Sequence, residues 1–246
     1  MNIWLVIPLA LAMLWLANRY QLWRIPKPTS WPRLLMYHSI SNEPPTGMNT
    51  PPANFEAQLA LLKQQGYVFC TVSELLATSQ KKAIAITFDD GFANNYDDAF
   101  PVLQKYHAKA TIYLAPDIAD IKKLSREQIV TMQASGLVEF GAHSLHHINL
   151  SQANAAQAQA EIMGSKERVE QLTGQPCVSF AYPFGRFNQQ TIDLVKAAGF
   201  SSAVTTKKNI IANLSKQPWT IPRISTHGAM TKLQFYIAVT RGRYKF

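Results

Sequence analysis

Short apolar runs alternate with amphipathic segments about seven times along this chain. The run from Ala83 to Phe88 is almost wholly apolar and has charged residues on both sides, which is typical of a strand buried on both faces of a parallel sheet. In the segment before it, Phe55, Leu59 and Leu62 recur at helical spacing. The alternation therefore predicts an α/β protein whose parallel strands form a sheet or a barrel.

Turn and capping signals divide the chain into elements. We expect strands at 34–38, 67–71, 83–88, 110–114, 138–142, 178–182, 202–206 and 220–224. We expect helices at 54–65, from Ser73, and at 94–106, 125–136, 151–172, 191–198 and 232–240. Functional side chains of such barrels lie at the carboxyl ends of the strands, so the residues that follow these runs are the first candidates for a site.

The N-terminus is a separate hydrophobic segment. Residues 3–17 form an apolar run interrupted by Pro8, with no Lys or Arg before it and no small-residue cleavage site after it. We therefore expect an uncleaved hydrophobic anchor helix within residues 1–25, with a cleaved signal peptide and an interfacial or buried helix as alternatives. A proline-rich linker at 26–33 and a single globular domain at 34–246 are expected to follow.

This organisation predicts a protein held at the bacterial cytoplasmic membrane by a single N-terminal anchor. Arg19, Arg24, Lys27 and Arg33 follow the apolar run, which favours a domain on the cytoplasmic side under the positive-inside rule. Only one short segment is involved, so the side of the membrane stays open.

The net charge of +9 is unevenly distributed. No Asp or Glu follows Asp193, whereas nine Lys and Arg residues do. We expect an anionic membrane surface as the partner of this basic region, and no nucleic acid, because the sequence has no zinc-finger spacing and no RNA-binding aromatic signature. The two cysteines, Cys70 and Cys177, exclude a disulfide framework and leave open whether they pair with each other.

Three short motifs carry residues suited to chemistry. Asp89 and Asp90 end the buried run at 83–88, where a tight turn at Gly91 can aim one carboxylate at a metal and the other at a substrate. His143 and His147 are four residues apart, a spacing that lets two imidazoles bind one metal. Two imidazoles and one carboxylate leave a coordination position for water. The third motif, at 180–185, reads by itself as a strand that ends in a Pro-Gly turn.

Together and in this order, the three motifs resemble those of the polysaccharide deacetylase family, also called carbohydrate esterase family 4 or the NodB-homology domain. The resemblance covers about residues 34–223. Residues 87–91 match the family's Thr-Phe-Asp-Asp-Gly in full, and His143, Ser144 and His147 match its His-Ser/Thr-x-x-His. Residues 180–185 match a branch with a Phe-Ala-Tyr-Pro-Tyr/Phe-Gly motif. With the alternation above, the resemblance implies a distorted (β/α) barrel of about seven parallel strands.

The resemblance also implies an activity. Asp90, His143 and His147 would bind a divalent metal, most often Zn²⁺, with Co²⁺, Ni²⁺ or Mn²⁺ as alternatives. Asp89 would be the general base that activates the water on that metal. The expected reaction is the metal-dependent removal of acetyl groups from N-acetylated amino sugars of a polysaccharide or cell-envelope glycan, such as a poly-N-acetylglucosamine-like chain, a chitin-like chain or peptidoglycan.

Two departures from the family pattern leave roles to be filled. Ala181 stands where many members have an arginine that orients the catalytic aspartate. The later run Pro222-Arg223-Ile224 matches one found in the same branch, so we expect Arg223 to supply the guanidinium, with a solvent-facing charge as the alternative. The family's last motif, Leu-x-His, which provides a general acid, is not present as such, and His227 and His38 are the two candidates.

The pocket and the substrate are less constrained. Tyr182, Pro183 and Phe184 are expected to line the sugar or acetyl pocket. An alternative substrate is an N-acetyl amino sugar linked to a lipid carrier at the cytoplasmic membrane face. A carbohydrate-binding relative that has lost turnover is a lesser alternative, and the sequence says nothing of the oligomeric state.

Overall fold

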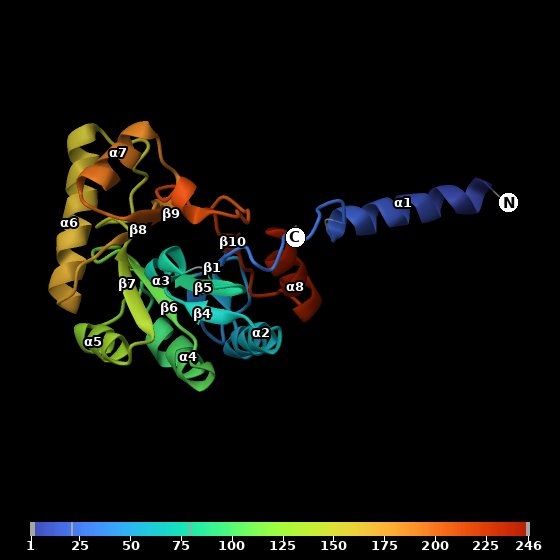
Figure 1. Cartoon of the computed structure of the whole chain (residues 1–246), viewed down its shortest axis with the longest axis horizontal. Helices are drawn as coiled ribbons and strands as arrows, with labels where there is room; N and C mark the ends of the chain where they lie inside the picture. Colours follow the sequence, from blue (N-terminus) through green and yellow to red (C-terminus); the bar gives the residue numbers. More distant parts are fainter. Residues whose placement is uncertain (1–2, 21, 79, 245–246) are drawn as a thin grey trace.

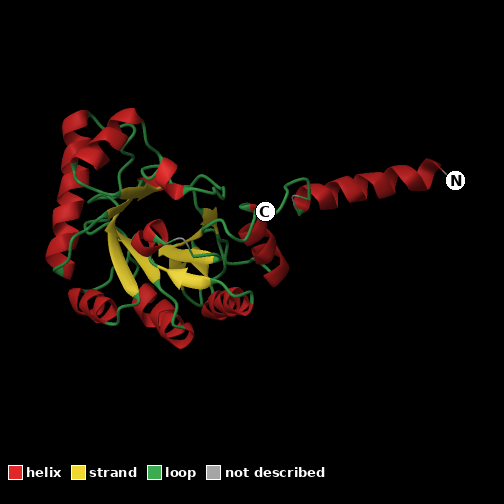
Figure 2. Ribbon diagram, in the orientation of Figure 1, coloured by secondary structure: helices red, strands yellow, loops and turns green. Residues whose placement is uncertain are grey.

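The structure is a computed structural model that describes residues 3–20, 22–78 and 80–244. A curved parallel sheet lies at its centre, and helices cover the outer face of that sheet (Figures 1 and 2). The strand order is β10-β1-β5-β6-β7-β8-β9, with β4 beside β5, and every pairing in this sheet is parallel. The expected parallel α/β architecture of about seven strands is confirmed.

The elements occupy the following residues. The strands of the main sheet are β1 (Arg33–Tyr37), β4 (Val68–Cys70), β5 (Ala83–Phe88), β6 (Ala110–Leu114), β7 (Val138–Ala142), β8 (Ser179–Ala181), β9 (Ser202–Val204) and β10 (Ile224–Ser225), and a separate pair is formed by β2 (Ser39–Ile40) and β3 (Asn49–Thr50). The helices are α1 (Ile3–Arg19), α2 (Pro52–Gln64), α3 (Val72–Ala77), α4 (Phe100–Tyr106), α5 (Arg126–Ala134), α6 (Ala155–Thr173), α7 (Gln189–Ala197) and α8 (Lys232–Arg241), and the shorter helical turns are η1 (Asn95–Ala99), η2 (Pro183–Gly185) and η3 (Leu214–Lys216).

Strand β5 has neighbours on both sides in the sheet, and all six of its residues are buried. It pairs with β1 along one edge, and with β4 and then β6 along the other. The register places Phe88, the last residue of β5, opposite Tyr37 of β1 and Ile112 of β6. Residues that directly follow the parallel strands therefore leave the sheet at one rim.

Several helices begin at other residues than the sequence predicts, because different side chains cap them. Helix α3 is capped by Thr71 rather than Ser73, and Glu74 completes the capping box. Asn154, not Ser151, caps α6. The helix expected at 94–106 opens as the π-helical turn η1, since Pro101 has no N–H for the next α-helical bond.

The N-terminal segment forms helix α1, which projects away from the rest of the molecule (Figure 1). From Val6 onward most of its large apolar side chains are exposed. It has 17 residues, fewer than the roughly 20 that a spanning helix needs. Nowhere in the described part of the chain does a helix combine the length and hydropathy needed to cross a bilayer, so the expected anchor is not supported there. Residues 1–2 and 21 of that expected segment lie outside the described residues.

The linker expected at 26–33 is packed onto the domain. The N–H of Lys27 donates to the carbonyl of Thr240 in α8 at 2.8 Å, and Arg33 is fully buried. The guanidinium of Arg33 donates to the carbonyls of Val239, Trp31 and Lys27. This segment is therefore tied to the last helix of the fold. Elsewhere in the core, the two cysteines are separate, buried free thiols.

Candidate active site

The turn after β5 places two carboxylates at the carboxyl-terminal edge of the sheet. Asp90 and Gly91 both have left-handed backbone conformations, with φ of +73° and +79°. A Cβ on Gly91 would lie 2.6 Å from Cδ2 of Leu114, so no larger residue fits this turn without a shift. The turn separates the two aspartates, and Asp89 and Asp90 consequently have different partners.

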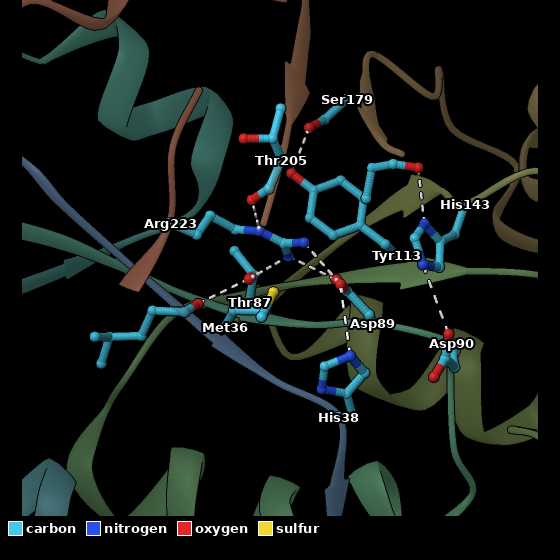
Figure 3. A network of polar contacts seen from close by, with 12 residues as sticks. Met36, His38, Thr87, Asp89, Asp90, Tyr113, His143, Ser179, Thr205 and Arg223 are labelled. Atoms are coloured by element: carbon cyan, nitrogen blue, oxygen red, sulfur yellow. Dashed lines mark hydrogen bonds and ion pairs between the residues drawn. The ribbon is translucent and has the colours of Figure 1, made fainter. Parts of the chain in front are cut away.

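Asp89 is held by Arg223, the residue that precedes β10 (Figure 3). Nη1 and Nη2 of the guanidinium donate to the two carboxylate oxygens of Asp89 at 2.6 and 2.7 Å. Nη1 also donates to Oγ1 of Thr87, and Nε donates to the carbonyl of Thr205. Arg223 is completely buried and Asp89 is 2% exposed, so this is a bidentate ion pair inside the protein.

The pair fixes the charge of Asp89. Burial by itself would raise the pKa of this carboxyl group, but the charge and hydrogen bonds of Arg223 hold it well below its usual range. Asp89 is therefore ionised at every ordinary pH. Thr87 is the first residue of the Thr-Phe-Asp-Asp-Gly motif at 87–91. Its contact with the guanidinium was not predicted from the sequence.

Asp90, His143 and His147 converge on one point. Their candidate ligand atoms all lie within 4.8 Å of one another. Oδ1 of Asp90 is 3.6 Å from Nε2 of His143 and 3.4 Å from Nε2 of His147. His143 follows β7, and its ring stands beside that of His147, with 4.8 Å between the centroids.

The state of these groups fits a divalent cation. Oδ1 of Asp90 is buried and has no hydrogen-bond partner among the described residues. Burial and the neighbouring Asp89 raise the pKa of Asp90 to about 7, and a cation at this point would lower it. Burial lowers the pKa of His143 to about 3, so its imidazole is neutral. Its Nδ1 must donate to the carbonyl of Ala181 at 2.7 Å, which leaves Nε2 as the ligand atom.

The two candidate acids, His38 and His227, have different neighbours. Nε2 of His38 is 3.9 Å from Oδ2 of Asp89, and its Nδ1 is buried without a hydrogen-bond partner in the described residues. Burial lowers the pKa of His38, while Asp89 opposes this effect. His227 follows β10, and its Nδ1 accepts a hydrogen bond from the N–H of Ala229. Partial burial and the charge of Lys208 lower the pKa of His227.

A cavity of about 420 Å³ connects these groups to the surface. His38, Asp89, Asp90, His143, His147 and His227 line it, together with residues that the sequence did not suggest: Met48, Thr206, Lys208 and Tyr244. No short motif marks those four residues, because they come from separate loops and the C-terminal segment.

One of the three residues expected to bind substrate lies at the cavity. Phe184 is 56% exposed, and its ring centroid is 4.5 Å from that of His147. Tyr182 is buried, and its hydroxyl donates to the carbonyl of Trp219. Neither Tyr182 nor Pro183 is among the described residues that line the cavity. The structure therefore places Tyr182 and Pro183 in the core, apart from the described residues that line this cavity.

Comparisons with known proteins agree on one group of relatives. A family model described as polysaccharide deacetylase matches residues 77–203. YxkH of Bacillus subtilis, named as a polysaccharide deacetylase, is 36% identical over 188 residues, which are 74% of this chain and 66% of that protein. A poly-beta-1,6-N-acetyl-D-glucosamine N-deacetylase of Staphylococcus epidermidis is 27% identical over 189 residues, or 69% of this chain and 65% of that protein. This chain thus spans about two thirds of the length of these relatives.

Solved structures show the same likeness. The deacetylase PplD of Streptococcus pyogenes, in complex with acetate, matches with a TM-score of 0.76 and 26% identity, over 88% of this chain and 99% of that one. A polysaccharide deacetylase of Bacillus cereus matches with a TM-score of 0.75 and 30% identity, over 85% of this chain and 69% of that one.

Proposed function

Because the chain belongs to the polysaccharide deacetylase family, we propose that it is a metal-dependent hydrolase that removes acetyl groups from N-acetylated amino sugars of a polysaccharide or cell-envelope glycan. The observation that carries this proposal is the placement of two adjacent carboxylates in separate roles. One is bound to a buried guanidinium, and the other lies within 3.6 Å of two imidazole nitrogens at the same cavity.

Asp90, His143 and His147 are the residues that would hold the metal. Two imidazole nitrogens and one carboxylate oxygen suit Zn²⁺, and Co²⁺, Ni²⁺ or Mn²⁺ are alternatives with the same donor set. When bound there, the cation would supply a Lewis acid that acidifies a water molecule and polarises the acetyl carbonyl. The hydrogen bond from His143 to the carbonyl of Ala181 keeps the ring in the tautomer that can coordinate.

Asp89 is the proposed general base. Arg223 keeps it ionised and fixes the plane of its carboxylate, so that Oδ2 faces the cavity side on which His38 lies. A carboxylate in this position takes a proton at Oδ2 from the attacking water. Its low pKa makes it a weak base, and its catalytic value therefore depends on fixed orientation rather than on basicity.

We propose His38 as the group that gives a proton to the departing amine, with His227 as the alternative. Nε2 of His38 lies 3.9 Å from Oδ2 of Asp89, whose charge offsets part of the lowering of the His38 pKa by burial. Lys208 has the opposite effect on His227. Replacing each histidine by Gln separates the two roles. The donor's variant loses kcat and the high-pH limb of the pH–rate profile, whereas the other variant keeps both.

The proposed substrate is a polymer of the kind named for the staphylococcal relative, a poly-β-1,6-linked N-acetylglucosamine. The exposed ring of Phe184 at the cavity mouth is suited to stack on a sugar face. A chitin-like chain and peptidoglycan are further candidates of the same chemical class. The lesser alternative, a carbohydrate-binding relative without turnover, predicts sugar binding with no release of acetate.

Acetate release from N-acetylglucosamine oligomers tests the proposal. Activity should be lost on chelation, return with Zn²⁺, and be lost in Asp89→Asn and in His143→Ala. Release that survives chelation, or survives both substitutions, would refute the mechanism. Sugar binding by the wild type with no acetate release under any metal would support the binding relative instead.

A second candidate substrate is an amino sugar linked to a lipid carrier. The exposed apolar residues of α1 and the basic C-terminal part favour it, because both suit attachment to an anionic membrane surface. We therefore propose localisation at the bacterial cytoplasmic membrane. C-terminal reporter fusions, one active outside the cytoplasmic membrane and one active inside, test the side. An outside domain favours polymers, and an inside domain favours the lipid-linked sugar.

A further inference from the structure

The loop that carries both imidazole ligands lies against helix α6, which packs beside β7 (Figure 1). Glu161 of α6 faces this loop, and its side chain is 9% exposed. One carboxylate oxygen of Glu161 accepts hydrogen bonds from the N–H groups of Leu145 and His146, both at 3.0 Å. The other oxygen is 2.7 Å from Nδ1 of His146. A single buried carboxylate thus binds three groups of the ligand loop.

These contacts hold a conformation that the loop would not adopt easily by itself. Ser144 and His147 have left-handed φ values of +60° and +56°, which residues other than glycine rarely adopt. The N–H groups bound by Glu161 lie between these two residues. The hydroxyl of Ser144 is buried and has no hydrogen-bond partner among the described residues, so it does not take over this task.

One turn further along α6, Gly164 receives the side chain of the same loop. A Cβ on Gly164 would lie 2.6 Å from Cδ1 of Leu145, so the leucine is seated directly on the helix backbone. Glycine is unfavourable inside a helix, and this close approach accounts for its presence. Glu161 and Gly164 therefore hold the backbone and the side chain of one loop residue, Leu145, from the same face of α6.

We propose that Glu161 is a positioning residue for the metal ligand His147. Its carboxylate fixes the loop so that Nε2 of His147 lies 3.4 Å from Oδ1 of Asp90, and in this way it sets the affinity of the cluster for a divalent cation. The inference rests on the proposed function, because it takes this cluster as the metal site. Glu161 touches neither substrate nor metal and acts through the backbone of the loop.

The test is the affinity of the metal-free full chain for Zn²⁺, measured by competition with a chromophoric chelator. Glu161→Gln keeps the shape of the side chain but removes one acceptor oxygen and the charge. We expect it to weaken Zn²⁺ binding about 10- to 100-fold, as the loss of a supporting partner does in other metal sites. Glu170→Gln is the matched control, because Glu170 also lies on α6 and accepts a backbone N–H, that of Cys177, away from the loop.

Two further readouts separate positioning from general stability. Urea unfolding of the metal-free protein should show that Glu161→Gln and Glu170→Gln are both fully folded under the conditions of the Zn²⁺ titration. The activity that Glu161→Gln loses at limiting Zn²⁺ should return at excess Zn²⁺. His146→Gln, which removes one of the three bonds at a half-exposed side chain, should weaken Zn²⁺ binding less than Glu161→Gln does.

The outcomes distinguish failure of the proposed metal site from failure of the proposed role of Glu161. Asp90→Asn is the reference for a destroyed site, and a wild type that binds Zn²⁺ no better than this variant refutes the proposed function itself. If the wild type binds Zn²⁺ and Glu161→Gln binds it equally well, or the control weakens binding as much, the role of Glu161 is refuted. If Glu161→Gln does not fold, Glu161→Asp is measured in its place. If neither variant folds even in excess Zn²⁺, Glu161 is needed for the whole fold, and a role confined to the loop is refuted.

Discussion

The buried ion pair of Arg223 with Asp89 predicts an effect on stability that can be measured without substrate. The guanidinium is fully buried and donates four hydrogen bonds, two of them to the carboxylate. Arg223→Met removes these donors and leaves a buried carboxylate without its counter-ion. Breaking a buried pair in this way costs about 3–5 kcal/mol. We expect the free energy of unfolding of the metal-free protein to fall by this amount.

A double-mutant cycle isolates the pair from the loss of packing. Asp89→Asn alone leaves a buried cation unpaired, whereas the double variant removes both charges. The double variant should therefore lose less unfolding free energy than the two single variants together, by at least about 1 kcal/mol. The exposed pair of Lys105 and Glu56, 2.6 Å apart, is the control, and its coupling should stay below about 1 kcal/mol. The assay is urea unfolding followed by circular dichroism with chelator present. Single effects that add within about 0.5 kcal/mol would refute the reasoning.

The same substitution changes how stability depends on pH. In the wild type Arg223 lowers the pKa of Asp89, so the stabilisation is present above the unfolded pKa of about 3.9 and is lost as the pH falls through the lower folded value. In Arg223→Met burial dominates and raises that pKa. The deficit of the variant should therefore be smallest in acid and grow as the pH rises through the raised value. A deficit that does not change with pH would contradict this.

Four further predictions concern metal, substrate and packing. Zn²⁺ at a hundredfold its dissociation constant should stabilise the native state by about 2.7 kcal/mol, seen as a rise in Tm by scanning fluorimetry that is absent in Asp90→Asn. Phe184→Ala should raise KM and change the free energy of unfolding by less than about 0.5 kcal/mol, because the ring is mostly exposed, and a fall in kcat alone would contradict a binding role. Gly91→Ala should lose about 1–3 kcal/mol in urea unfolding, since its φ is +79° and the new Cβ meets Leu114. Burial raises the pKa of Cys177 to about 12, so thiol reagents should label it only on unfolding, and rapid labelling of the native protein would count against its burial.

The sheet and the rim of the site could be predicted because they depend on signals that lie close together in the sequence. Buried strands are continuous apolar runs, and parallel strands place the residues after 83–88 and after 138–142 at the same edge. Element starts were predicted less well, since Thr71 and Ser73 are both acceptable caps and only the fold determines which one meets a free N–H group. The short pair β2 and β3 lies in a loop whose sequence gives no strand pattern.

The side on which a strand residue lies was the harder inference. Tyr182 belongs to a motif at a strand end, yet its N–H continues the ladder to Val204, and its ring packs on Phe180 in the core. All three residues of β8 are buried, so alternation cannot separate an inward from an outward face there. Phe184 reaches the cavity because the backbone turns at this residue, where φ is +57°. The predicted Pro-Gly turn is present at 183–185, but the motif does not show which of its aromatic rings the turn directs into the cavity.

The origin of the guanidinium shows why a gap in a motif does not mean a gap in a site. Ala181, at the position where the family pattern often has an arginine, is fully buried, and its carbonyl accepts a hydrogen bond from His143. The guanidinium comes instead from Arg223, 134 residues after Asp89 in the chain. Strand β10, which begins directly after Arg223, pairs with β1, and β1 pairs with β5, so the arginine lies two strands from the aspartate. Its Nε is held by the carbonyl of Thr205, just beyond β9 at the other edge of the sheet. One side chain thus connects both edges of the open barrel to the carboxylate that follows β5, so the orientation of that carboxylate depends on how both edges of the sheet are placed.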